Sequence, residues 1–221
     1  MPLFTLKNVN FNNIIKFPDI EIPENISTFI CGESGCGKST LLKLLNGVIS
    51  STDGEINYLG KNIEDFEPIS LRRDVLLVGQ TTYLFDKTIK DNFDEYYAYR
   101  GQSPISEKAM ESFLDICSVN LPLGSLCNTL SGGEQQRVFI AINLSFQPRV
   151  LMMDEPTSAL DDKNAAALMK NIKSFCKDNG ITLIVVSHDK AIADKYADNI
   201  ISLQGRAEGG GEVLAGGAKY E

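Results

Sequence analysis

A glycine-rich segment near the start of the chain reads Gly32-Glu33-Ser34-Gly35-Cys36-Gly37-Lys38-Ser39-Thr40. It follows an apolar run at 26–31 that favours a β-strand, and it precedes a leucine-rich run at 41–45 that favours a helix. The pattern G-x-x-x-x-G-K-[ST] in this setting predicts a loop whose backbone N–H groups surround a phosphate. We expect Lys38 to reach the β- and γ-phosphates of a nucleotide and the Ser39 hydroxyl to bind Mg²⁺.

A second segment predicts the other half of such a site. It reads Val150-Leu151-Met152-Met153-Asp154-Glu155, four apolar residues followed by two carboxylates. An apolar strand that ends in acidic residues is common by itself. Downstream of a phosphate loop, however, it indicates a catalytic site at the end of that strand, beside the loop. We expect Asp154 to hold the Mg²⁺ shell and Glu155 to orient and deprotonate the attacking water.

A third segment, Leu130-Ser131-Gly132-Gly133-Glu134-Gln135-Gln136-Arg137, marks the start of a helix that ends before Pro148. Ser131 and Glu134 have the spacing of a capping box, which alone would explain them. A capping box does not require Gly132 and Gly133, however. Two glycines at a helix N-terminus expose backbone N–H groups to an anion, and a second phosphate contact on the same chain suggests half-sites completed by a second copy.

Strand-like and helix-like runs alternate along the rest of the chain. We expect strands at 3–9, 55–58, 75–78 and 181–186 and helices at 163–178 and 190–196. This alternation predicts an α/β fold, a mainly parallel sheet core with an antiparallel β subdomain and a helical subdomain at about 81–147. At 221 residues the chain suits one domain, 1–221, and its glycine-rich tail, 205–221, is expected to be flexible.

Composition and charge exclude several classes of protein. The net charge of −8 disfavours broad nucleic-acid binding, because such a surface repels phosphate backbones. No apolar run approaches the roughly 18 residues of a membrane-spanning helix, and the first residues lack the pattern of a signal peptide. We therefore expect a cytoplasmic protein.

The cysteines form neither a C-x-x-C pair nor an even framework, which indicates reduced thiols. Cys36 lies among the N–H groups of the phosphate loop and beside Lys38. This position predicts a reactive thiol that a bound nucleotide protects. The alternative is an unreactive residue that only fills space.

The order of these motifs resembles the nucleotide-binding subunit of ABC transporters. It runs from the phosphate loop through Gln80, the 130–134 segment, Asp154-Glu155 and Ser158-Ala159-Leu160-Asp161 to His188, and the similarity extends from about Leu6 to about Gln204. The resemblance implies a P-loop NTPase of ABC type that binds ATP and Mg²⁺ and hydrolyses ATP. It also implies a head-to-tail, ATP-dependent homodimer attached to an integral-membrane permease on the inner face of the cell membrane.

The family's functional residues transfer only to matching positions. Gln80 would sense the γ-phosphate and the membrane partner and contact Mg²⁺. Ser131, Gly132, Gly133 and Glu134 would close on the ATP of the opposite subunit, and Asp161 would bridge the two sites. A lone histidine is more often structural, but His188 follows a buried strand, where α/β sheets build sites. There the family uses it to hold the γ-phosphate and the attacking water.

Two positions depart from the family pattern. Glu134 stands where the commonest form has Gln, a tolerable change because both can close a capping box. Asn13 stands where many relatives have an aromatic residue that stacks on adenine. Phe11 is the nearest substitute, although it also fits a buried strand position.

Alternative functions remain within this family. DNA-repair and chromosome-structuring members need a coiled coil or zinc modules between the motif halves, and this chain has neither. A binding-only module is opposed by Lys38, Asp154, Glu155 and His188. An ATPase that serves a soluble assembly such as iron–sulfur cluster biogenesis stays open. The segments at 80–92 and 201–204 look most like a bacterial subgroup of iron or metal exporters.

Overall fold

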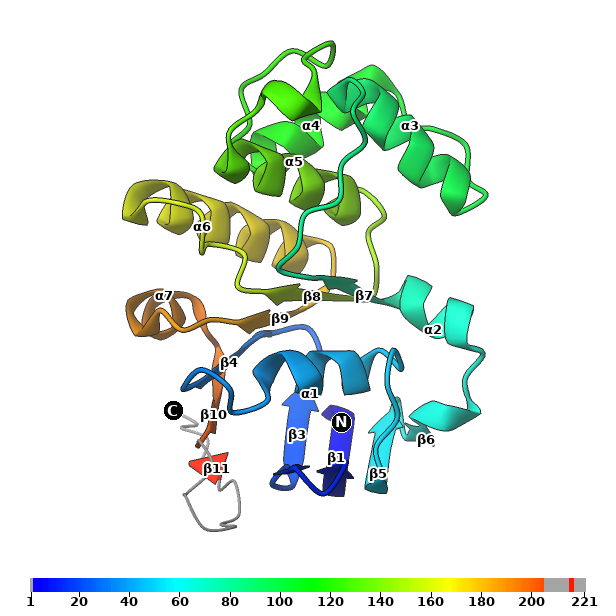
Figure 1. Cartoon of the computed structure of the whole chain (residues 1–221), viewed down its shortest axis with the longest axis vertical. Helices are drawn as coiled ribbons and strands as arrows, with labels where there is room; N and C mark the ends of the chain where they lie inside the picture. Colours follow the sequence, from blue (N-terminus) through cyan, green and yellow to red (C-terminus); the bar gives the residue numbers. More distant parts are fainter. Residues whose placement is uncertain (1, 205–214, 217–221) are drawn as a thin grey trace.

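The computed structural model describes residues 2–204 and the backbone of residues 215–216. The expected flexible tail lies outside the described residues, apart from the short strand β11 (Ala215–Gly216). Figure 1 shows two sheets with a group of helices at one end of the molecule. None of the helices in the described ranges is long and apolar enough to cross a bilayer.

The larger sheet has the strand order β11-β10-β4-β9-β8-β7. All neighbouring pairs from β10 to β7 are parallel, and only β11 is antiparallel to its neighbour. This confirms the predicted mainly parallel core. The strands besides β11 are β4 (Ser27–Gly32), β7 (Val75–Val78), β8 (Val150–Asp154), β9 (Thr182–Val186) and β10 (Asn199–Leu203).

The smaller sheet is antiparallel and has the order β2-β1-β5-β6, with β3 paired to β1. It confirms the predicted antiparallel β unit. It lies below α1 in Figure 1. Its strands are β1 (Pro2–Phe11), β2 (Ile15–Lys16), β3 (Ile20–Pro23), β5 (Asp53–Tyr58) and β6 (Lys61–Asn62).

Three helices gather at the top of Figure 1, within the stretch predicted to be helical: α3 (Ile89–Tyr99), α4 (Glu107–Ile116) and α5 (Gly132–Leu144). The predicted capping box of Ser131 and Glu134 is present at the start of α5, and Ser106 caps α4 by accepting from the backbone N–H of Ala109. The other helical segments are α1 (Lys38–Leu45), α2 (Pro68–Asp74), α6 (Asp162–Asp178), α7 (Lys190–Tyr196) and the 3₁₀ turns η1 (Ile63–Asp65) and η2 (Cys127–Thr129).

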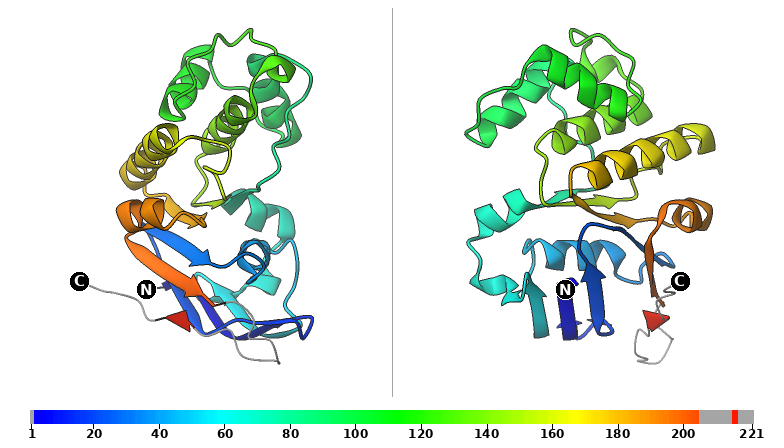
Figure 2. Two further views of the ribbon diagram at one scale, coloured as in Figure 1. Left: turned by 60° about the vertical axis from the view of Figure 1, so that its left-hand side comes forward. Right: turned by 180° about the vertical axis from the view of Figure 1, so that it is seen from behind.

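The parallel sheet separates two apolar cores, because successive side chains of a strand point to opposite faces. In β8, Leu151 and Met153 join a core with α5, α6 and α7, whereas Val150 and Met152 join a core with α1 and the antiparallel sheet. The views of Figure 2 show α6 and α1 on opposite sides of this sheet. A strand buried on both faces reads as a continuous apolar run, which is the pattern that predicted β8.

The register of the sheet brings three strand ends together. Val186 at the end of β9 lies opposite Ile30 of β4 on one side and Asp154 of β8 on the other. The carboxyl ends of parallel strands meet at one edge of a sheet, where ligand sites form. The segments that follow β4, β8 and β9 therefore share one edge.

Candidate functional site

The glycine-rich segment joins β4 to α1, as predicted. Gly37 has φ +97°, a left-handed conformation that glycine adopts without strain. Gly32 lies so close to β10 that a Cβ atom there would be 2.2 Å from the carbonyl oxygen of Leu203. No side chain of the described residues caps the N-terminus of α1, so the N–H groups of its first turn stay open for an anion.

Lys38 lies inside this loop and is only 7% exposed. Its Nζ donates to the carbonyl oxygens of Gly32 and Glu33, both at 2.8 Å, and lies 4.0 Å from Sγ of Cys36. The loop carbonyls thus hold the ammonium group in the curve of the backbone. A buried ammonium at the N-terminus of a helix favours a negatively charged ligand in front of it.

A pocket of about 350 Å³ lies in front of the loop. It brings together three parts of the predicted site, namely the phosphate loop, Gln80 after β7 and Glu155 after β8. Its lining is formed by Ile15, Ser34, Gly35, Gly37, Lys38, Ser39, Thr40, Gln80 and Glu155. Residues more than a hundred positions apart in sequence therefore face one ligand-sized space.

Glu155 lies where the strand ends meet. Its backbone N–H donates to the carbonyl of Val186 at 3.0 Å, and its φ of +51° turns the chain away from the sheet. Its carboxylate accepts from Nε2 of Gln80 at 3.4 Å and lies 3.6 Å from Nδ1 of His188. Two of the residues predicted to be catalytic, Gln80 and His188, thus both contact a third, Glu155.

Asp154, the last residue of β8, is half-buried, and Ser39 at the start of α1 is exposed to the pocket. Among the residues that the structure describes, no group of three or more His, Cys, Asp or Glu side chains could hold a metal by itself. One carboxylate, one hydroxyl and an amide suit Mg²⁺, which takes few protein ligands and fills its shell with water and phosphate oxygens. The donor set therefore fits Mg²⁺ bound together with a nucleotide.

The 131–134 segment lies elsewhere on the molecule. The Ser131 hydroxyl and backbone N–H donate to the Glu134 carboxylate at 2.6 and 2.9 Å, which completes the capping box of α5. A Cβ atom on Gly133 would be 3.0 Å from the carbonyl oxygen of Ala159, so this glycine permits close contact with the turn before α6. None of the described residues that line the phosphate pocket comes from this segment.

Asp161 is the N-cap of α6. It accepts from the backbone N–H of Asn164 at 2.9 Å and from its side chain at 2.6 Å. These hydrogen bonds hold the pKa of the Asp161 carboxyl below its usual range. The residue is exposed and does not line the phosphate pocket of this chain, so within one chain its visible contacts are those of a helix cap.

The structure places Phe11, the residue predicted to stack on the base, away from the phosphate pocket. Phe11, the predicted residue, is half-buried at the end of β1 and packs against the core beneath the antiparallel sheet. It does not line the pocket; Ile15 of β2 does. A Cβ atom on Gly37 would lie 3.0 Å from Cδ1 of Ile15, which places this aliphatic side chain directly against the phosphate loop.

Cys36 differs from the expectation of a reactive thiol. It is 4% exposed and belongs to the core that contains α1, so a reagent has no access to it in this conformation. Cys31 is the half-buried cysteine of the five, and burial raises the pKa of its thiol. The fold of the loop turns the side chain of Cys36 inward, which the spacing of the motif did not reveal.

Sequence reasoning missed two buried amides near the site. Asn92 in α3 accepts from the backbone N–H of Phe85 and donates to the carbonyls of Phe85 and Thr88, and so fastens the segment after Gln80 to the helical end. Gln136 in α5 donates to the backbone carbonyl of Glu155 at 3.3 Å. The sequence signal that could have indicated them is a polar residue at a position surrounded by apolar residues within a predicted helix.

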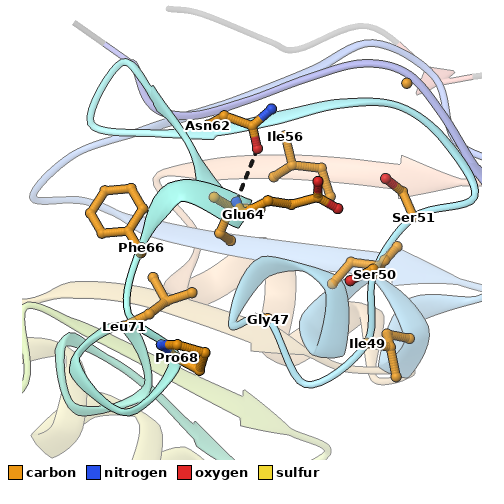
Figure 3. A pocket seen from close by; sticks show the side chains of 13 residues that line it. Gly47, Ile49, Ser50, Ser51, Ile56, Asn62, Glu64, Phe66, Pro68 and Leu71 are labelled. Atoms are coloured by element: carbon orange, nitrogen blue, oxygen red, sulfur yellow. Dashed lines mark hydrogen bonds between the residues drawn. The ribbon is translucent and has the colours of Figure 1, made fainter.

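A second hollow of about 410 Å³ lies at the C-terminal end of α1 (Figure 3). Its lining mixes apolar side chains with Asn62, Glu64 and two serines, and Asn62 caps η1 by accepting from the Glu64 N–H at 3.0 Å. Among the described residues that line it, none belongs to the predicted site, and the one charged side chain is the acidic Glu64, which disfavours a phosphate ligand.

The comparison with known families agrees with this site. Residues 16–158 match the family described as "ABC transporter". The chain therefore belongs to the ABC transporter family, as one of its ATP-binding subunits, and these cassettes are ATPases. The fold is the ABC ATPase cassette.

Curated relatives include both export and import proteins. The chain is 36% identical over 232 residues to "Probable iron export ATP-binding protein FetA" of Escherichia coli (strain K12), a match that covers 100% of this chain and 97% of that protein. It is 37% identical over 190 residues to "Phosphate import ATP-binding protein PstB 3" of Natronomonas pharaonis, covering 81% of this chain and 68% of that protein.

Solved structures of similar fold include CbiO1 of Clostridium perfringens, described as part of the ABC transporter complex CbiONQ. It has a TM-score of 0.80 at 26% identity, over 96% of this chain and 87% of that one. The dimeric bacterial cassette MJ0796 has a TM-score of 0.80 at 29% identity, over 95% and 96% of the two chains. Its post-hydrolysis dimer with ADP and Pi has a TM-score of 0.78 at 29% identity, with the same coverage of both chains.

Proposed function

We propose that this chain binds and hydrolyses MgATP as a head-to-tail homodimer and thereby drives a separate integral-membrane permease. One observation carries the proposal: a single pocket brings Lys38, Ser39, Gln80 and Glu155 together in front of an uncapped helix N-terminus. That arrangement supplies a cradle for the triphosphate and a carboxylate for an attacking water.

Within this pocket, Lys38 and the N–H groups at the start of α1 hold the β- and γ-phosphates. Ser39, Asp154 and Gln80 hold Mg²⁺, which neutralises charge on the phosphate oxygens when bound. Lys38 is already buried in the loop, so the nucleotide replaces loop carbonyls as its partner without a large movement.

Glu155 is the general base of this proposal. Its carboxylate lies between Gln80 and His188, where it can accept the proton of the attacking water. His188 and Gln80 donate hydrogen bonds to the water or to the γ-phosphate and so fix the direction of attack. Positioning of the water matters because loose phosphoryl transition states depend on alignment and electrostatics.

The site becomes complete only across a dimer. Ser131, Gly132, Gly133 and Glu134 lie at the N-terminus of α5, away from the phosphate pocket of their own chain. We propose that they close on the ATP of a second copy, and that the exposed Asp161 lies between the two sites. The solved dimers of the similar cassette MJ0796 support dimerisation.

The proposed permease contact lies beyond Gln80. Tyr83, Phe85 and Tyr99 are 68%, 38% and 74% exposed, and the rings of Phe85 and Tyr99 stack at 6.0 Å. An exposed aromatic cluster of this kind is typical of protein–protein contacts. Through this contact the chain would be held at the cytoplasmic face of the cell membrane, and its charge of −8 makes nucleic acid an unfavourable partner.

The cargo of the proposal is iron or another metal that is moved outward. The support for this cargo is the iron-export relative, which is 36% identical over 100% of this chain and 97% of that protein. Cells that lack this chain should retain more iron under iron load, and wild type but not Glu155→Gln should restore the lower content. Unchanged metal content in the deletion strain would refute metal export.

The test of the ATPase proposal pairs this chain with a candidate permease, an integral-membrane protein of the same cell. The two are produced together in detergent or lipid, and ATP hydrolysis is compared with that of the chain alone. We expect co-purification and faster hydrolysis in the complex, with both lost in Tyr83→Ala/Tyr99→Ala and retained in a control pair on α4, Glu111→Ala/Asp115→Ala. Stimulation by a soluble complex instead would favour an assembly ATPase.

A further inference from the structure

Gln136 is a buried amide that points out of its own helix. It lies in α5, is 6% exposed, and donates from Nε2 to the backbone carbonyl of Glu155 at 3.3 Å. The amide nitrogen, and not the amide oxygen, must face the Glu155 carbonyl, because two oxygen acceptors cannot form a hydrogen bond with each other. Its Oε1 finds no hydrogen-bond partner among the described residues. Burial of a half-satisfied amide costs about 1–3 kcal/mol, so an apolar side chain would serve packing better.

The backbone of Glu155 needs support. Its φ of +51° is left-handed, a conformation that costs a residue with a Cβ atom about 1 kcal/mol or more. Three hydrogen bonds oppose that cost: the N–H donates to Val186 at 3.0 Å, and the carbonyl accepts from the N–H of Ser158 at 3.2 Å and from Gln136. Of these three hydrogen bonds, the bond from Gln136 is the one that involves a side chain.

The residues proposed to bind the second copy's nucleotide lie about one turn before Gln136, at the N-terminus of α5. Gly133 and Gln136 are three positions apart, so they share a face of the helix. Gly133 lies against Ala159 and Leu160, as the short distances from a Cβ atom there indicate, and Gln136 contacts Glu155. The N-terminal end of α5 therefore contacts the 155–160 segment at two points, Gly133 and Gln136.

We propose that Gln136 is a positioning residue that sets the place of Glu155 and links it to the N-terminus of α5. The inference rests on the proposed function, in which Ser131 to Gly133 close on the nucleotide of the second subunit. When that contact forms, α5 is fixed, and Gln136 then fixes the backbone that carries the general base of its own site. Each site becomes competent in response to the other. Affinity for ATP is unaffected, because Gln136 does not line the phosphate pocket.

The test replaces Gln136 by methionine, which keeps length and volume and removes the donor. Steady-state hydrolysis is measured against ATP concentration for the purified full chain. We expect kcat to fall at least about tenfold, KM to stay within about twofold, and the Hill coefficient to fall from above 1 in wild type towards 1. A purely structural role would instead lower thermal stability and leave cooperativity unchanged.

Asn143→Leu is the matched control. Asn143 is a buried amide of the same helix whose Nδ2 donates to the carbonyl of Phe139 in that helix, whereas Gln136 donates to the backbone of Glu155. Its loss should alter stability and leave the Hill coefficient at the wild-type value. Wild-type kinetics in Gln136→Met, or an equal loss in Asn143→Leu, would overturn the role of Gln136 and leave the ATPase proposal intact. A wild-type chain that hydrolyses no ATP would overturn both.

A second variant keeps the test decisive if Gln136→Met folds poorly. Gln136→Glu can donate to the Glu155 carbonyl only when its carboxyl is protonated, and burial raises the pKa of such a group. Its kcat relative to wild type should therefore rise as pH falls from about 8 to 6. Division by the wild-type rate at each pH removes the pH effects that the two proteins share. A flat ratio over this range would contradict the proposal.

Discussion

At the scale of single residues, the proposed chemistry of the pocket depends most on Glu155. Its carboxylate contacts both Gln80 and His188, and it is the only carboxylate that lines the phosphate pocket among the described residues. The sequence predicted Glu155 from its place after an apolar strand. The roles of Gln80 and His188 came from the family resemblance, and for His188 its place after a buried strand agreed with it. The sequence did not predict Gln136, since no local pattern states which face of α5 meets the sheet edge.

Glu155→Gln should therefore abolish turnover and preserve ATP binding. The amide keeps the volume and removes the proton acceptor, and loss of a general base costs about 10²–10⁴ in rate. We expect a nucleotide-dependent dimer to accumulate, visible by size-exclusion chromatography with MgATP. The control is Glu107→Gln, which removes an exposed carboxylate in the first turn of α4 and should leave kcat unchanged. Near-normal turnover in Glu155→Gln would remove this residue from the mechanism.

The cysteines give a second prediction at this scale. Cys31 is half-buried, whereas Cys36, Cys117, Cys127 and Cys176 are 4%, 0%, 2% and 1% exposed. A short exposure to maleimide should label Cys31 first, and labelling should accelerate as pH rises because burial raises the pKa of its thiol. Peptide mass spectrometry measures the order, with urea-unfolded protein as the control. Labelling of Cys36 at the same rate as Cys31 would support the prediction, made from the sequence, that Cys36 is a reactive thiol.

At the scale of elements, strong local patterns were enough to predict most of the sheet. β8 and β9 are continuous apolar runs, and the α5 cap has its own spacing signal. The small elements β3 and α2 were not predicted. Ile20–Pro23 is an edge segment defined by its pairing with β1, and Pro68–Asp74 has one buried residue, so neither carries a periodic signal.

The capping box of α5 predicts a pH-dependent stability. Hydrogen bonds from Ser131 lower the pKa of Glu134 below its ordinary value of 4.5. The charged cap therefore stabilises the fold above pH 4.5, and this contribution is lost as pH falls through the lower pKa of the folded state. Wild type should exceed Glu134→Gln by a few tenths of a kcal/mol at pH 7, because the site is exposed.

Urea denaturation at pH 7 and pH 3.5 checks this difference. It should shrink at the lower pH, because the contribution of the Glu134 charge is lost progressively as pH falls below 4.5. Asp162→Asn, which removes a carboxylate from the first turn of α6, controls for general effects of net charge. ATP hydrolysis should persist in Glu134→Gln, since glutamine also closes a capping box. A difference that is the same at both pH values would show that the Glu134 charge does not act through the cap.

At the scale of the whole molecule, the separation of the phosphate pocket from the α5 N-terminus leads to a complementation test. Lys38→Ala removes one half-site, and Ser131→Arg removes the other. A heterodimer of the two variants contains one site with an intact Lys38 and an intact Ser131. ATP-induced dimerisation, measured by light scattering, should therefore be partly rescued in the mixture and absent for Ser131→Arg alone. An inactive mixture would indicate a site completed within one chain.

The shape of the pocket also bears on which nucleotide the dimer accepts. Adenine stacking on an aromatic ring contributes about 1–3 kcal/mol and tolerates changes of base. Here Asn13 is exposed with φ +53°, Phe11 packs into the core, and the aliphatic Ile15 borders the phosphate loop. Most of the affinity should then come from the triphosphate contacts at residues 34–40, which are the same for ATP and GTP.

We therefore expect GTP to be hydrolysed with a kcat/KM within about tenfold of that for ATP, a gap of at most about 1.4 kcal/mol. Asn13→Tyr should lower KM for both nucleotides by adding the missing ring, whereas Phe11→Ala should lower the melting temperature and leave KM unchanged. Steady-state kinetics with both nucleotides measure this. A preference for ATP above a hundredfold would mean that polar groups read the base edge, and a severalfold rise of KM in Phe11→Ala would return Phe11 to the base-binding position.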